Sequence, residues 1–134
     1  VMPRLNARYD EIRKNEVMVE KFKTEGADFV LCAYGTVARV CKAAVRILAE
    51  NGIKCGLVRP ITLWPFPTQD VHDVITQETV QGALTVEISN GQMVEDVRLA
   101  VNGEKPVEFM GKGGSIIPSA EEIAERVMQI MRRA

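Results

Sequence analysis

The stretch Asp28-Phe29-Val30-Leu31-Cys32-Ala33-Tyr34-Gly35-Thr36 decides the fold of this chain. The run from Asp28 to Tyr34 is almost unbrokenly apolar, which is typical of a strand buried on both faces of a parallel sheet. Gly35 and Thr36 interrupt the run, and an amphipathic segment over residues 37–51 follows, with Thr36 as its expected cap. A strand that turns directly into a helix is the first half of a βαβ unit.

The same alternation of strand and helix continues to the end of the chain. We expect strands at residues 54–59, 83–89 and 106–110, and helices at residues 69–77, at 92–101 and from Ser119 onward. Asn51-Gly52 stops the first helix, Thr68 caps the second, and Ser119 with Glu122 forms a capping box for the last. The pattern indicates an α/β fold with three αβα layers and a mainly parallel sheet, flavodoxin-like in outline. The strand at 106–110 is expected near an edge of that sheet.

The segment before this core is expected to be a leading helix over residues 1–26, packed on an α/β core over residues 27–134 as one domain. Its helical periodicity runs from Arg4 to about Glu25, and Gly26 is a suitable stop. The run at residues 16–20 is the alternative, a short strand. The opening Val1 suggests that the chain is a fragment of a larger subunit.

Composition excludes several classes of protein. The chain has 134 residues, of which 46% are hydrophobic and 26% charged, as in a globular domain rather than a disordered chain. The net charge of −1 is spread along the chain and favours neither nucleic acid nor an anionic membrane surface as a partner. No apolar run approaches the ~18 residues of a membrane span, and no apolar signal segment follows the N-terminus. We expect a cytoplasmic protein, because its three cysteines suit a reducing compartment.

Residues that carry chemistry are scarce. No CxxC pair occurs among Cys32, Cys41 and Cys55, so a zinc knuckle is not expected. We expect these three cysteines to be buried in the core as reduced thiols. His72 is the only histidine, on the polar face of its expected helix, without a nucleophile nearby. The sequence thus predicts no catalytic and no metal-binding residue in this chain.

Candidate site residues lie in the turns that follow the strands, because ligands and partners of parallel α/β sheets meet the carboxyl ends of the strands. Gly35 and Thr36 offer free amides that suit an anion, although a plain turn explains them equally well. Asn90-Gly91-Gln92 forms the corresponding turn further along the chain. The stretch Gly111-Lys112-Gly113-Gly114-Ser115 lacks the spacing of a phosphate loop, which argues against a nucleoside triphosphate site.

The loop after the second expected strand holds three further candidates. Arg59 ends a buried strand and needs a partner, either Glu87 on the next strand or a carboxylate on a neighbouring domain. Trp64 and Phe66 stand among three prolines. They either pack back on this domain or form a partner surface, since aromatic residues and arginine are typical interface anchors.

Four stretches of the chain carry a family resemblance. They are residues 28–39 (DFVLCAYGTVAR), 56–67 (GLVRPITLWPFP), 87–98 (EISNGQMVEDVR) and 106–114. Together they resemble the C-terminal, transketolase C-terminal-like domain of the α-type subunit of 2-oxoacid:ferredoxin oxidoreductases, most closely the 2-oxoisovalerate enzyme. The resemblance runs from about Tyr9 to Met131. Trp64 departs from it conservatively, because phenylalanine is commoner there.

The resemblance implies a parent complex that oxidatively decarboxylates a 2-oxoacid, joins the acyl group to coenzyme A and reduces ferredoxin. Thiamine diphosphate, Mg²⁺ and iron–sulfur clusters would serve that complex, outside this chain. The isolated domain would be inert and would pack on other domains and subunits. Two alternatives stay open: a domain that binds a small anion or a phosphate of coenzyme A at the turns after Gly35 and Asn90, and a transketolase or 2-oxoacid dehydrogenase β-type domain. The 87–98 motif argues against the second.

Overall fold

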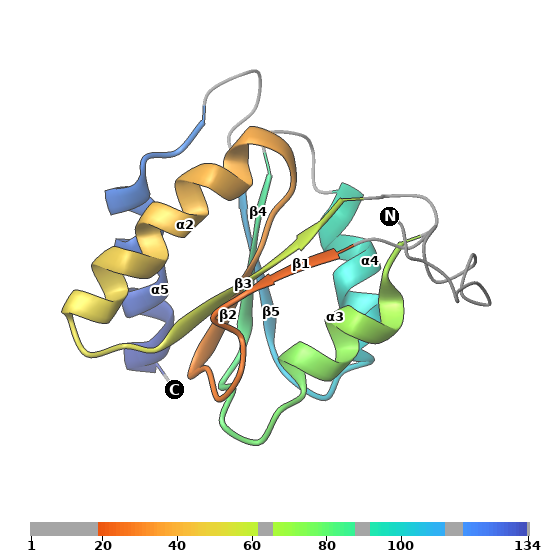
Figure 1. Cartoon of the computed structure of the whole chain (residues 1–134). Coiled ribbons are helices and arrows are strands. Elements are labelled where there is room, and N and C mark those ends of the chain that lie inside the picture. The colour runs from red at the N-terminus through yellow and green to blue at the C-terminus, as the bar shows by residue number, and fades with distance from the viewer. Residues whose placement is uncertain (1–18, 62–65, 88–91, 112–116, 134) are drawn as a thin grey trace, which may run out of the picture.

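A five-stranded sheet forms the middle layer of the protein (Figure 1). The computed structural model describes residues 19–61, 66–87, 92–111 and 117–133, and all structural statements concern these residues. The strands are β1 (Val19–Phe22), β2 (Phe29–Cys32), β3 (Cys55–Pro60), β4 (Ala83–Glu87) and β5 (Val107–Gly111), in the order β1-β3-β2-β4-β5. β2 to β5 run parallel, and β1 pairs antiparallel with β3. The predicted α/β class and the edge position of the last strand are confirmed.

Helices cover both faces of the sheet. They are α2 (Gly35–Glu50), α3 (Thr68–Ile75), α4 (Gln92–Val101) and α5 (Ala120–Arg133). In Figure 1, α2 and α5 lie side by side on one face, and α3 and α4 lie on the other. The predicted three layers are confirmed.

β2 is apolar throughout because its side chains contribute to the core on both faces of the sheet. Phe29 and Leu31 pack with α2 and α5, whereas Val30 and Cys32 pack with α3 and α4. All of β2 is buried. Complete burial of one large apolar side chain stabilises the fold by roughly 1.5–3 kcal/mol, so β2 joins the two half-cores into one domain.

The prediction of a leading helix is wrong at its C-terminal end, where the structure has strand β1. The alternative of a short strand over residues 16–20 agrees with β1 at residues 19–20 only. Val19 lies opposite Pro60 and Phe22 opposite Leu57 in the antiparallel register. This pairing satisfies the outer backbone groups of β3, which would otherwise form a free sheet edge. The chain leaves β1 close to β3: a Cβ on Gly56 would lie 2.7 Å from Thr24 Cα. The rest of the expected helix, residues 1–18, lies outside the described residues.

Two predicted caps are wrong, because α2 begins two residues and α3 one residue earlier than expected. α2 starts at Gly35, whose φ of +65° suits glycine, and no side chain caps it. Thr36 lies inside its first turn. Thr68 is likewise the first residue of α3, and its hydroxyl donates to the carbonyl of Phe66 at 3.4 Å.

Two other helix ends agree with the sequence. The Ser119 N–H donates to Glu122 Oε1 at 2.8 Å, and the Glu122 N–H donates to Ser119 Oγ at 3.1 Å, which confirms the capping box. At the end of α2, Gly52 has a φ of +79°, and the Ile53 N–H donates to the Leu48 carbonyl at 2.9 Å. That bond belongs to a Schellman motif, which confirms the predicted stop.

Candidate functional site

The candidate site lies at the carboxyl ends of β2, β3 and β4. β2 lies between β3 and β4 in the sheet. The chain passes from β2 to β3 on one side and then crosses to β4 on the other side, so the strand order changes direction at β2. A cavity of about 150 Å³ opens at this point, lined by Tyr34, Gly35, Thr36, Val37, Val86 and Glu87. The structure thus places Gly35 and Thr36 where ligands of open α/β sheets bind.

Glu87 stabilises the start of α4 from the interior. Its side chain is only 1% exposed, yet its two carboxylate oxygens accept the backbone N–H groups of Met93 at 3.0 Å and Val94 at 2.9 Å. The first turn of a helix leaves such donors unpaired and favours a negative charge. The glutamate that opens the 87–98 motif is therefore a helix cap.

Arg59 does not pair with Glu87, so that alternative is wrong. Its Nε donates to Glu20 Oε1 on β1 at 2.7 Å, and Lys42 Nζ on α2 donates to Glu20 Oε2 at 2.9 Å. The β1–β3 register sets Glu20 opposite Arg59, while β2 separates Arg59 from Glu87 on β4. The hydrogen bond from Lys42, followed by the one from Arg59, lowers the pKa of Glu20.

A second cavity, of about 160 Å³, is basic. Its lining is Gly35, Ala38, Arg39, Lys42 and Arg59, and we call it the basic cavity. Gly35 and Arg59 were predicted as site residues from the sequence, whereas Arg39, Lys42 and Glu20 were not. A signal was present, because residues three apart on a helix lie on one face, as Arg39 and Lys42 do.

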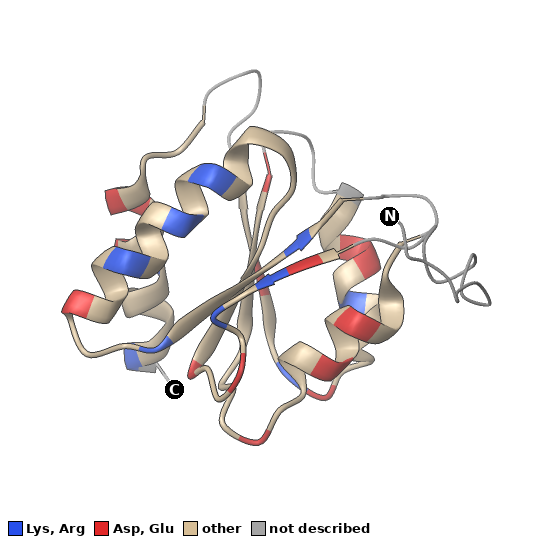
Figure 2. Cartoon of the chain, in the orientation of Figure 1, with Lys and Arg blue, Asp and Glu red and all other residues tan. Residues whose placement is uncertain are grey.

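Charge is unevenly distributed over the two helical layers (Figure 2). Arg39, Lys42 and Arg46 follow one another along α2, whereas α3 carries Asp70 and Asp73. α4 adds a further acidic pair at residues 95–96. The uneven distribution therefore lies in individual helices, with a basic run on α2 and acidic residues on α3, within a net charge of −1. Within the described ranges, no helix is both long and apolar enough for a bilayer crossing.

Of the remaining site residues predicted from the sequence, two lie within the described residues and three do not. Phe66 is half-buried and packs against the core beneath α3 and α4, so it packs back on its own domain. Gln92 is the first residue of α4, and only its place in that helix is described. Trp64, Asn90 and Gly91 lie outside the described residues, as does the segment 112–116.

The cysteines are buried thiols, as predicted. Burial raises the pKa of Cys32 and of Cys41 to about 12, so neither is a thiolate near neutral pH. In the described part of the chain, no group of three His, Cys, Asp or Glu side chains could hold a metal ion.

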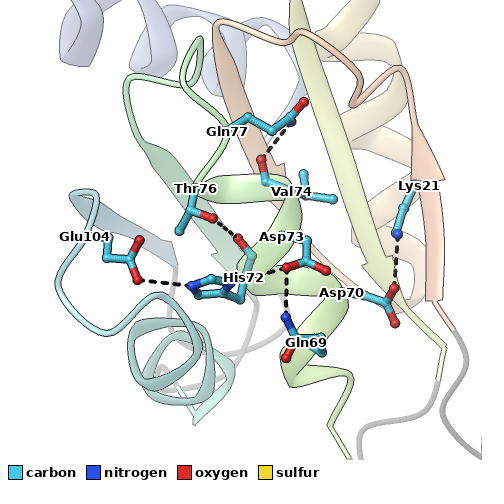
Figure 3. A network of polar contacts seen from close by, with 9 residues as sticks. All are labelled: Lys21, Gln69, Asp70, His72, Asp73, Val74, Thr76, Gln77 and Glu104. Atoms are coloured by element: carbon cyan, nitrogen blue, oxygen red, sulfur yellow. Dashed lines mark hydrogen bonds and ion pairs between the residues drawn. The ribbon is translucent and has the colours of Figure 1, made fainter.

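His72 belongs to a polar network on the outside of α3 (Figure 3). Its Nε2 lies 3.1 Å from Glu104 Oε2, and its Nδ1 lies 3.4 Å from Asp73 Oδ1, which also accepts a hydrogen bond from Gln69. The contact with Glu104, more than that with Asp73, raises the pKa of His72. The side chain lies on the polar face, as expected, and is held between carboxylates rather than beside a nucleophile.

Comparison with solved structures defines the class of this protein. A split gene transketolase shares the fold at a TM-score of 0.71 and 16% identity, over 86% of this chain and 41% of the transketolase chain. The 2-oxoglutarate:ferredoxin oxidoreductase from Magnetococcus marinus shares it at a TM-score of 0.65 and 22% identity, over 84% of this chain and 19% of that chain. The chain therefore shares the α/β fold of these two proteins.

Sequence comparison gives the family. Residues 27–123 match the pyruvate:ferredoxin oxidoreductase core domain II, and the chain belongs to that family. The ketoisovalerate oxidoreductase subunit VorB of Methanothermobacter marburgensis is 38% identical over 129 residues, which are 94% of this chain and 35% of the relative. The chain thus spans about a third of the length of this relative. The family resemblance stated from the four stretches is confirmed.

Proposed function

We propose that this chain is a structural domain of a 2-oxoacid:ferredoxin oxidoreductase that acts on 2-oxoisovalerate. The family match over residues 27–123 carries the proposal, and the 38% identity to a ketoisovalerate oxidoreductase subunit supports the branched-chain substrate. The parent enzyme would convert the 2-oxoacid to its acyl-coenzyme A thioester in the cytoplasm and pass electrons to ferredoxin. Thiamine diphosphate, Mg²⁺ and the iron–sulfur clusters would be bound by its other domains and subunits.

The uses of the polar side chains support a domain without catalytic residues of its own. Glu87 caps α4, and Arg59 pairs with Glu20, so these two site residues stabilise the domain itself. The thiols of the core are protonated and enclosed. General acid–base or nucleophilic catalysis needs a titratable group that reaches a substrate, and these groups have structural tasks instead.

The carboxyl edge of the sheet is the surface that we propose for contact with the other domains and subunits. Ile61 follows β3 and is 46% exposed, and Ile117, between β5 and α5, is 40% exposed. Trp64 follows Ile61 in the same loop. Exposed apolar side chains gain free energy when a partner covers them, and aromatic residues are frequent anchors of such interfaces.

The test reconstitutes the enzyme from the full subunit and its partner subunits. We expect 2-oxoacid-dependent reduction of ferredoxin that is fastest with 2-oxoisovalerate, when 2-oxoglutarate and pyruvate are compared. Ile61→Ser should weaken subunit association about fivefold, because about 1 kcal/mol of apolar burial is lost. Trp64→Ala should weaken association more than it lowers the unfolding free energy of the isolated domain.

Leu99→Ser is the matched control, since Leu99 is 77% exposed but lies in α4, away from this edge. It should leave association unchanged. Equal weakening by Ile61→Ser and Leu99→Ser would refute the interface. Absence of activity with all three 2-oxoacids would refute the proposed reaction.

A further inference from the structure

The basic cavity concentrates positive charge from two elements of the fold. Arg39 and Lys42 reach it from α2, and Arg59 reaches it from β3. Glu20 is the carboxylate that contacts two of these cations, Lys42 and Arg59. Three cations and one carboxylate leave a local net charge of +2 in a protein whose overall charge is −1. The fold therefore builds a local positive potential against its own net charge.

Arg39 supplies the donors that remain for a ligand. Among the described residues it forms no hydrogen bond and no ion pair, and its side chain is exposed at the mouth of the basic cavity. Lys42 and Arg59 are each bonded to Glu20 through one nitrogen, Nζ and Nε. A guanidinium carries five N–H donors and an ammonium three, so each keeps unused donors after that bond.

The backbone beside these side chains suits an anion as well. α2 begins at Gly35, which has no Cβ and has open space where one would be. The first turn of α2 contains no acidic residue and receives no side-chain cap. The positive end of the helix dipole therefore adds to the charge of the side chains that line the cavity.

We propose that the basic cavity binds the phosphate group of a small molecule. A phosphate monoester carries a charge of about −1.5 to −2 at neutral pH and three acceptor oxygens, which matches the local charge and the cations that converge from α2 and β3. A single carboxylate carries half that charge and is satisfied by one arginine. This site rests on side chains of α2 and β3 and is independent of the proposed oxidoreductase function.

The test titrates inorganic phosphate into the isotopically labelled full chain and follows the amide signals of Gly35 and Ala38. We expect saturable shifts of both signals. Arg39→Gln should weaken binding about tenfold, because one charge-assisted interaction is lost. Glu20→Gln should strengthen binding, since it removes the carboxylate that competes for Lys42 and Arg59.

Arg46→Gln is the matched control, because it removes the same charge from the same helix outside the lining of the cavity. It should change the affinity for phosphate by less than about twofold, because only a long-range attraction that salt screens is lost. Three results would overturn the proposal: no saturable shift, equal weakening by Arg39→Gln and Arg46→Gln, or succinate binding as tightly as phosphate. The last would assign the cavity to carboxylates.

Discussion

Two glutamates of this domain have similar tasks in opposite surroundings. Glu20 lies on edge strand β1, about a third exposed, and accepts hydrogen bonds from the charged side chains of Lys42 and Arg59. Glu87 lies at the end of β4, almost completely buried, and accepts hydrogen bonds from two backbone N–H groups of α4. Both carboxylates join separate elements, one at the surface and one inside.

The difference lies in what replaces a lost contact. If Glu20 is removed, water solvates Lys42 and Arg59, so little free energy is lost. If Glu87 is removed, the amides at the start of α4 lose their acceptor where water has little access, and the desolvation penalty remains. Replacing the buried Glu87 should therefore lower the free energy of unfolding more than replacing the exposed Glu20. Glu20 mainly sets the local charge near Lys42 and Arg59.

The largest effect is expected for Glu87→Gln. The substitution keeps the shape of the side chain but turns one acceptor oxygen into a donor that faces a backbone N–H. We expect a loss of about 1–3 kcal/mol in the free energy of unfolding, measured by urea denaturation. Glu95→Gln, on the exposed face of the first turn of α4, is the control and should cost less than about 0.5 kcal/mol. Equal losses for the two variants would show that Glu87 is not a buried cap.

A smaller effect is expected from the surface pair. A double-mutant cycle with Glu20→Gln and Arg59→Gln should give a coupling free energy of about 0.5 kcal/mol at low salt. The coupling should shrink in about 1 M salt, where the Debye length is only ~3 Å. A cycle of Glu20→Gln with Arg46→Gln should give almost none. A coupling free energy as large as the loss caused by Glu87→Gln would contradict the expected difference between the exposed and the buried glutamate.

The smallest effect is expected from His72, whose contacts with carboxylates depend on pH. Glu104 raises its pKa above the ordinary 6.5, so protonated His72 stabilises the folded state. That contribution is complete below the unfolded pKa and disappears as the pH rises through the folded pKa. The unfolding free energies of wild type and His72→Gln should therefore differ at about pH 6 and converge at about pH 8.5.

Nuclear magnetic resonance reports this titration directly, because His72 is the only histidine of the chain. Glu104→Gln should lower the pKa of His72 toward its ordinary value, whereas Glu108→Gln, on β5, should not. A pKa at or below 6.5 in the wild type would contradict the network of Figure 3.

Features that depend on neighbours in the chain were predictable. The β2–α2 unit follows from an apolar run and a glycine, and the Ser119–Glu122 capping box follows from spacing alone. Burial of Cys32 and Cys55 follows from their apolar neighbours. In each case the residues that determine the feature are close to one another in the sequence, so the sequence pattern predicts it.

Features that depend on strand order were not predictable. Arg59 was expected to contact either Glu87 or another domain, because the sequence does not show that β2 lies between β3 and β4. The partner it has, Glu20, precedes it by 39 positions and reaches it only because β1 adds to the edge of β3. The same strand addition brings Glu20 to Lys42 and completes the basic cavity.

By itself, the sequence determined the class of the fold and its family, because periodicity, turn residues and motifs are properties of neighbouring positions. The tertiary structure decided which charges meet. Lys42 and Arg59 share one carboxylate, and Glu87 holds the start of α4, since these contacts join elements far apart in the chain. Within the described ranges, Arg39 forms no hydrogen bond or ion pair. Electrostatic interactions act through space, so their partners become known only when the sheet is assembled.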